Sequence, residues 1–239
     1  MRTLYALGLC VVWAAALAQA PPAAPPDPFK GSAALGYLST SGNTESTNGN
    51  ASFKVTWDRM GPWKHDWNAL AINARTSGVT TAEAYSAGYK AQRDFSATSY
   101  LFASGDWRQD RFSGYDRQVT ETLGYGRRLI DTQRQTLALE GGAGAKQSDL
   151  SDDTELDEAI VRGGFDYVLR LTESSEFSQK IVIEQGDDNR YSESTSALKA
   201  RIVGNLAIIL SYVIKNNSDV PVGIEKTDRF TAISLEYGF

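Results

Sequence analysis

Apolar and polar side chains alternate along most of this chain, which is the pattern of β-strands whose two faces meet different surroundings. In the last such segment, Ile233, Leu235, Tyr237 and Phe239 share one face, and small or polar residues occupy the positions between them. No segment of useful length shows the 3.6-residue repeat of an amphipathic helix. The alternating runs have roughly the 9–11 residues that a tilted membrane-spanning strand needs. The pattern therefore predicts an all-β protein and favours a membrane barrel.

Twelve segments follow this alternation, and the connections between them fall into two classes. The predicted strand ranges are 31–40, 47–58, 65–75, 82–93, 99–109, 117–129, 135–146, 159–171, 176–185, 192–203, 206–215 and 229–239. Every second connection is short, and the others are longer and more polar. This arrangement predicts an up-and-down antiparallel transmembrane β-barrel of about twelve strands, with short periplasmic turns, longer extracellular loops and both termini in the periplasm. A soluble periplasmic β-sandwich is the structural alternative.

The N-terminal segment has the composition of a secretory signal peptide. Arg2 precedes an uncharged stretch that ends in small residues, and cleavage is expected after Ala18. We therefore predict a cleaved signal peptide over 1–18, a Pro-rich periplasmic leader over 19–30 and the barrel over 31–239. The single cysteine, Cys10, lies in the signal peptide, so no disulfide framework is available.

The C-terminus and the aromatic residues indicate the Gram-negative outer membrane. Leu235, Tyr237 and Phe239 resemble the C-terminal signature by which the barrel-assembly machinery recognises its substrates. The aromatic side chains that fall near strand ends are Trp57, Tyr89, Tyr125, Tyr167 and Phe239 on the periplasmic side and Trp107 and Tyr212 on the other. The expected partners are outer-membrane lipid, lipopolysaccharide and the assembly machinery, while the oligomeric state stays open. A net charge of −5 disfavours a nucleic-acid partner.

Charged residues on the polar face of the predicted strands should line the lumen. The basic ones are Lys54, Lys90, Arg108, Arg128, Lys146, Arg162, Arg170, Lys180, Lys199 and Arg201. The acidic ones are Asp106, Glu140, Asp166, Glu176, Glu184, Glu193 and Glu236. Charges inside a barrel must pair or contact water, so the interior is either a paired polar plug or a narrow water-filled pore. The basic excess would favour small anions if a pore exists.

Catalytic and metal-binding patterns are weak in this chain. The only histidine, His65, lies beside the first short turn, so an outer-membrane hydrolase is disfavoured and no enzymatic activity or cofactor is expected. The acidic segment Asp149, Asp152, Asp153, Glu155, Asp157 and Glu158 is a weak candidate for binding a divalent ion. This segment lacks the spacing of a calcium-binding loop.

The motif Gly36-Tyr37-Leu38-Ser39-Thr40-Ser41-Gly42-Asn43-Thr44-Glu45, followed by an alternating strand, resembles the opening of the YdiY-like family. Its members are described as salt-induced outer-membrane proteins and grouped as a domain of unknown function. The resemblance implies a bacterial outer-membrane barrel and supplies no catalytic residues. Two functional hypotheses stand beside the disfavoured hydrolase. One is a narrow pore or envelope protein linked to salt or osmotic conditions. The other is a non-conducting structural or adhesive barrel that acts through its loops.

Overall fold

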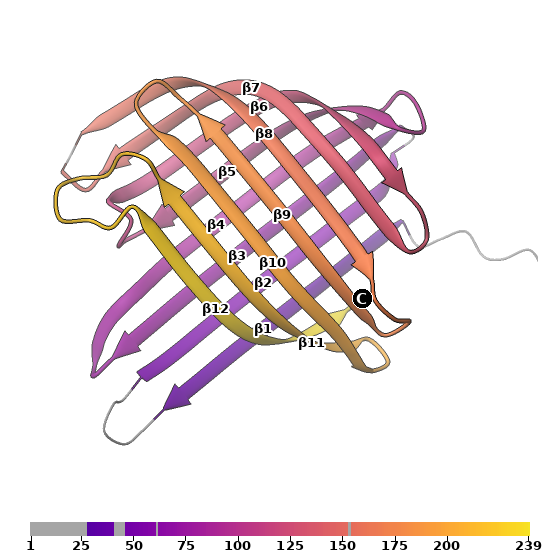
Figure 1. Ribbon diagram of the computed structural model, residues 1–239, viewed down its shortest axis with the longest axis horizontal. Coiled ribbons are helices and arrows are strands. Elements are labelled where there is room, and N and C mark those ends of the chain that lie inside the picture. The colour runs from indigo at the N-terminus through magenta and orange to yellow at the C-terminus, as the bar shows by residue number, and fades with distance from the viewer. Residues whose placement is uncertain (1–27, 41–45, 61, 153) are drawn as a thin grey trace, which may run out of the picture.

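The strands close into a single antiparallel barrel, shown in Figure 1. This computed structural model describes residues 28–40, 46–60, 62–152 and 154–239, so the predicted signal peptide and most of the predicted Pro-rich leader lie outside the described residues. The strands are β1 (Phe29–Thr40), β2 (Ser46–Met60), β3 (Trp63–Thr76), β4 (Val79–Asp94), β5 (Ser99–Asp110), β6 (Tyr115–Asp131), β7 (Gln135–Leu150), β8 (Glu155–Arg170), β9 (Ser175–Gln185), β10 (Arg190–Val203), β11 (Leu206–Asn217) and β12 (Thr227–Gly238). Each strand pairs with its neighbours in sequence, and β12 pairs back onto β1. The predicted twelve-stranded up-and-down barrel is therefore confirmed, and the single closed sheet excludes a two-sheet sandwich.

The connections at the two ends of the barrel differ less in length than the sequence suggests. We term the end with Phe29 and Phe239 the terminal end and the opposite end the loop end. At the loop end β3 and β4 are joined only by Ser77 and Gly78, whose φ angles of 51° and 79° suit the tight type I′ turn of a hairpin. Among the described residues, the one long connection at the loop end is 218–226, between β11 and β12. The strands extend into polar segments here because main-chain pairing does not depend on the polarity of the side chains.

The outer face of the barrel is apolar. Leu35, Leu123 and Val161 expose 70%, 70% and 66% of their surface, whereas Thr120 and Glu184 on the opposite face are fully buried. A water-soluble protein shows the reverse distribution. Within the described residues, no helix is long and apolar enough to cross a membrane. The outward apolar face matches the lipid-facing surface of a membrane barrel.

Aromatic rings gather on the outer surface near the terminal end. His65 lies 6.0 Å from the ring of Trp57 and 5.9 Å from that of Trp67, and its Nδ1 atom is 2.8 Å from the Tyr89 hydroxyl. Phe239 packs beside Phe29 and Phe53. Rings in this position suit the boundary between lipid and water.

The seam between β1 and β12 is short. These strands pair in register over four positions, from Ser32↔Gly238 to Leu35↔Leu235, whereas β1 and β2 pair over twelve. Beyond the seam the strands diverge towards the loop end, as Figure 1 shows. Ser234 of β12 donates a hydrogen bond of 2.7 Å to Asn50 of β2, bypassing β1 on the inner side.

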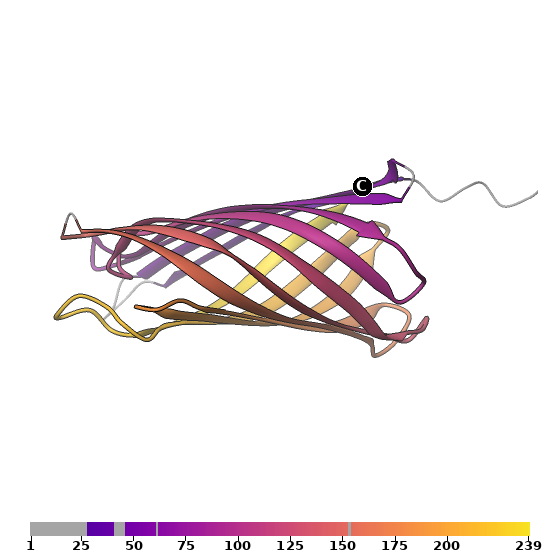
Figure 2. The ribbon, with the colours of Figure 1, turned by 90° about the horizontal axis from the view of Figure 1, so that it is seen from above.

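The cross-section of the barrel is flattened, because it is wide in Figure 1 and shallow in Figure 2. Flattening brings opposite walls close enough for long side chains to meet between them. This shape determines how the lumen is filled.

Candidate functional site

Ion pairs between strands that are not neighbours identify the lumenal face. Arg108 on β5 contacts Glu184 on β9, and Lys90 on β4 contacts Glu140 on β7. The sheet places three strands between β5 and β9, so side chains from these two strands meet only across the interior. The pairing register puts the other predicted lumenal residues on this same face.

The central feature of the lumen is a network around Glu184, whose side chain is fully buried. Arg108 donates two hydrogen bonds to this carboxylate, at 3.0 and 2.8 Å, in the bidentate geometry that favours arginine–carboxylate pairs. Arg162 lies 3.5 Å from Glu184 and 2.6 Å from Asp106. The Arg108 guanidinium also stacks 4.4 Å above the ring of Tyr191. We term Arg108, Glu184, Arg162 and Asp106 the lumenal ion network.

The lumen is constricted between this network and the loop end. The buried pair Lys146–Glu158 lies beside the network, at 3.6 Å. Nearer the loop end, the Tyr115 hydroxyl donates a hydrogen bond to the backbone oxygen of Asp219, and a Cβ at Gly114 would come within 2.7 Å of Pro221. The connection 218–226 therefore reaches from β11 to the β5–β6 connection on the opposite wall.

The cavity beside Arg108 and Tyr191 is small. A cavity of about 20 Å³ is lined by residues that include Arg108, Asp110, Tyr191 and Lys215. A volume of this size holds about one water molecule. A larger solute would have to displace side chains.

The half of the lumen towards the terminal end is accessible to solvent. Lys54, Asp166 and Lys180 are exposed although they lie on the inner face. Among the described residues, none of these three makes an ion pair within 4.0 Å. Water therefore reaches the lumen from this end.

The remaining predicted lumenal charges have separate partners. Tyr100 donates a 2.7 Å hydrogen bond to the Glu140 carboxylate, which also pairs with Lys90. Lys199 pairs with Glu236 at 2.5 Å. Three further contacts complete the set: Arg128 with Asp94, the Tyr191 hydroxyl with Glu193, and Arg201 with the backbone oxygen of Glu173. Arg170 and Glu176 lie opposite each other in the β8–β9 register.

Sequence reasoning missed several lumenal charges. Asp94, Asp110 and Glu158 form ion pairs with Arg128, Lys215 and Lys146, respectively. They lie at strand ends that the alternation had assigned to connections. Adding three acids and one new cation, Lys215, leaves little basic excess to attract anions.

Most of the acidic segment lies within the paired strands β7 and β8. β7 and β8 extend through it, so that Asp149 and Glu155 are paired in register, and Asp149 forms an ion pair with Arg117 at 2.9 Å. Hydrogen bonds from the Thr154 side chain and backbone lower the pKa of Asp152. Asp157 also lies within the β7–β8 register, whereas Asp153 lies outside the described residues. The part of the chain that the structure describes contains no group of three metal-ligating side chains arranged to hold an ion.

His65 lies in the outer aromatic cluster. Its ring stacks against Trp67 and Tyr89, and the cluster is on the lipid-facing side near the terminal end. A general base for hydrolysis would need a nucleophile beside it. The contacts of His65 are instead those of an interfacial aromatic side chain.

The C-terminal residues of the predicted assembly signal lie on the outer surface. Leu235, Tyr237 and Phe239 expose 49%, 56% and 51% of their surface, respectively. Phe239 also exchanges two backbone hydrogen bonds with Gly31, at 2.8 and 2.9 Å, which extend the β1–β12 seam.

Solved structures with this fold are outer-membrane barrels. The COG4313 outer membrane channel from Pseudomonas putida F1 superposes with a TM-score of 0.52 at 9% identity, covering 92% of this chain and 99% of that one. The NanC porin superposes with a TM-score of 0.50 at 9% identity, covering 87% and 97%. At this identity the likeness concerns the fold alone.

Sequence comparison identifies the family. The uncharacterized protein YdiY of Escherichia coli (strain K12) is 29% identical over 218 residues, which cover 90% of this chain and 85% of YdiY. The family described as "Protein of unknown function, DUF481" matches residues 33–239. This match spans all of the barrel except the first four residues of β1 and agrees with the resemblance drawn from the Gly36–Glu45 motif. The chain therefore belongs to the DUF481 family.

Proposed function

We propose that the protein is a narrow outer-membrane channel for water and small ions, whose bore is limited by the lumenal ion network. The observation that carries this proposal is the Arg108–Glu184 pair, which joins two opposite walls above a half-lumen that solvent reaches. Similarity to an outer-membrane channel and a porin supports the location and the type of function. With both termini periplasmic, the loop end is extracellular and the network lies in the outer half of the membrane.

The small cavity above the network limits what such a channel passes. This cavity of about 20 Å³ has room for about one water molecule, so we expect water and small ions to pass and sugars to be excluded. The lumenal cations are nearly matched by carboxylates, so we expect weak ion selectivity instead of the anion preference that the sequence suggested.

Single-channel recording of the refolded protein in planar bilayers tests the proposal. We expect small, steady openings with a reversal potential near zero under a salt gradient. The double variant Arg108→Gln/Glu184→Gln removes the ion pair without leaving either partner unpaired, and it should raise the conductance. The control Arg117→Gln breaks the exposed Arg117–Asp149 pair and should leave the conductance unchanged.

A silent bilayer, from protein shown to be a folded barrel, would contradict the channel. That result would favour a non-conducting structural or adhesive barrel. The specific observation in favour of this second function is the connection 218–226, which packs across the extracellular mouth through Tyr115 and Gly114. If the wild-type protein is silent but a variant with residues 219–224 shortened conducts ions, the protein is a channel that this connection blocks.

A role under salt or osmotic stress is included in the proposal and is supported by the family resemblance. Growth of a strain that lacks the gene, compared at low and high salt, tests it. Complementation by the wild-type protein but not by the Arg108→Gln/Glu184→Gln variant would connect the phenotype with the lumen. Equal growth of the two strains at every salt concentration would count against the role.

A further inference from the structure

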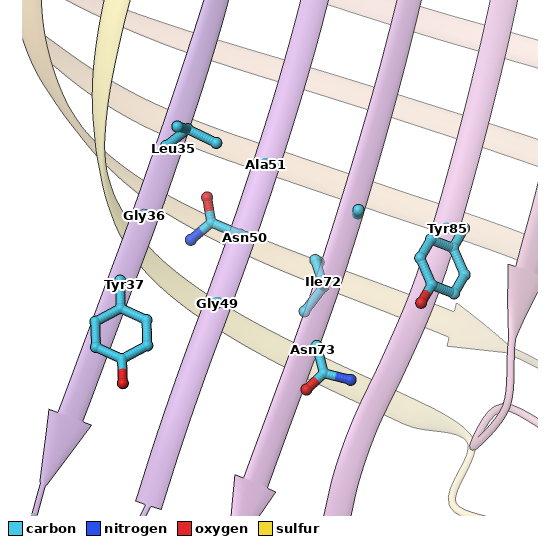
Figure 3. A pocket seen from close by; sticks show the side chains of 10 residues that line it. Leu35, Gly36, Tyr37, Gly49, Asn50, Ala51, Ile72, Asn73 and Tyr85 are labelled. Atoms are coloured by element: carbon cyan, nitrogen blue, oxygen red, sulfur yellow. The ribbon is translucent and has the colours of Figure 1, made fainter.

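A groove on the outer surface of β1–β4 lies in the half of the barrel nearer the loop end. Its volume is about 470 Å³, within the range of roughly 300–1,000 Å³ typical of small-molecule sites. Figure 3 shows Leu35 and Tyr37 on one side and Tyr85 on the other. The floor between them includes Gly49, Ala51 and Ala71. We term these six residues the outer groove.

The absence of a Cβ atom at Gly49 keeps the outer groove open. A Cβ atom built at this position would meet no atom within 4 Å, and its φ is not in the left-handed region. Neither the backbone nor a neighbouring side chain therefore requires glycine here. A larger strand-forming residue would fill the floor between Tyr37 and Tyr85, since both rings rise from the same face.

The lining of the outer groove favours an apolar occupant. Leu35, Tyr37 and Tyr85 expose 70%, 73% and 40% of their surface towards the surroundings of the barrel. In a bilayer, an empty hollow on this face would forfeit dispersion contacts along its walls. A flexible acyl chain supplies those contacts, and the two tyrosine hydroxyls suit the level of the polar headgroups.

An exposed arginine lies at the extracellular end of the outer groove. Asn73 lines the groove, and Arg75 follows it by two residues on the same face of β3, about 7 Å further towards the loop end. Arg75 is exposed and, among the described residues, has no ion pair or hydrogen bond. The neighbouring Arg111 is paired with Glu83 at 3.2 Å. A guanidinium in this position matches the geometry and charge of a phosphate group.

We propose that the outer groove binds one acyl chain of lipid A, the phosphorylated and acylated glucosamine lipid of the outer leaflet, and that Arg75 binds its phosphate. The apolar floor accounts for the acyl chain, and the exposed guanidinium of Arg75 accounts for the phosphate. The extracellular half of the barrel contacts the leaflet in which this lipid resides. The inference rests on the proposed membrane location and not on conduction, so a silent channel would leave it intact.

Filling the groove tests the acyl-chain part. The full chain is folded in detergent, its folding is checked by heat-modifiable gel migration, and purified lipid A is titrated with native mass spectrometry as the readout. Gly49→Val should weaken retention of lipid A by about tenfold or more. The control Gly163→Val makes the same change at an outer-face glycine of β8 that also has open space, and it should bind like the wild type.

Removing the cation tests the phosphate part. Arg75→Gln should weaken binding of phosphorylated lipid A by about tenfold, while binding of dephosphorylated lipid A stays unchanged. Arg127→Gln, at an exposed outer-face arginine near the terminal end, is the matched control and should change neither.

Three results would overturn the inference. The first is a folded wild-type protein that retains no lipid A. The second is equal loss of binding in Gly49→Val and Gly163→Val. The third is retention of phosphatidylglycerol as tight as that of lipid A, which would reduce the groove to a general contact with anionic lipid.

Discussion

Replacing Glu184 by Gln should destabilise the barrel strongly, because the Glu184 side chain is the common acceptor of two arginines. Its carboxylate is fully buried, receives two hydrogen bonds from Arg108 and lies 3.5 Å from Arg162. The amide of glutamine has nearly the same shape but carries no charge. The substitution therefore isolates the electrostatic part of the network.

The size of the effect depends on the contacts that Arg108 and Arg162 retain after Glu184 is replaced. Removing one partner of a buried pair costs about 3–5 kcal/mol in unfolding free energy. The amide oxygen of the substituted glutamine still accepts one hydrogen bond from Arg108, and Arg162 keeps its 2.6 Å contact with Asp106. We therefore expect the lower value, about 3 kcal/mol. The Arg108→Gln/Glu184→Gln double variant should lose about 2 kcal/mol less unfolding free energy than the sum of the two single variants.

Urea unfolding of the protein in lipid vesicles, followed by tryptophan fluorescence, measures these values. The dependence on urea should keep its slope, because the surface exposed on unfolding does not change. Glu155→Gln, at an exposed position of β8, serves as the control and should shift stability by less than about 0.5 kcal/mol. An effect of Glu184→Gln as small as that of the control would refute the reasoning, because it would mean that water already solvates both arginines.

Three further predictions concern the fold and its assembly. Ser77→Asn should raise stability by a few tenths of a kcal/mol in the same urea assay, because asparagine tolerates the positive φ of this type I′ turn better than serine. Gly144→Ala should lower the yield of refolded barrel sharply, since its Cβ would lie 1.8 Å from the Glu121 backbone oxygen, whereas Gly141→Ala in the same strand should refold normally. Deletion of Phe239 should reduce the heat-modifiable barrel recovered from outer membranes, and normal recovery would contradict the assigned assembly signal.

Sequence alternation predicts the fold well because one face of each strand lies on the apolar outer surface and the other lies on the polar lumen. Phe177, Ile181 and Ile183 oppose charged residues in β9, and the predicted range 176–185 differs from the observed strand by one residue. The alternation fails at the loop end of β7 and β8, where polar side chains occur on both faces. Asp149 and Glu155 therefore looked like loop residues, although they are paired in register.

The lumenal face could be predicted from the sequence, but the contacts across the lumen could not. Alternation assigns Arg108 and Glu184 to the same face of the sheet, yet nothing in their positions, 76 residues apart, indicates that they meet. Their contact depends on the flattened cross-section and on the register of the intervening strands. The outer groove was missed for a similar reason, because Gly49 and Ala71 appear in sequence only as weakly apolar strand residues.

The short β1–β12 seam is the pairing that closes the barrel. Its four register pairs and the two Phe239–Gly31 backbone hydrogen bonds join the first strand to the last. Until this seam forms during insertion into a membrane, the protein is an open sheet in which β1 and β12 are free edges. We expect the same few hydrogen bonds to break first when the barrel begins to unfold. Amide hydrogens of Ala33 and Leu35 should therefore exchange with solvent faster than those at the β6–β7 pairing, even though both positions lie within regular strands.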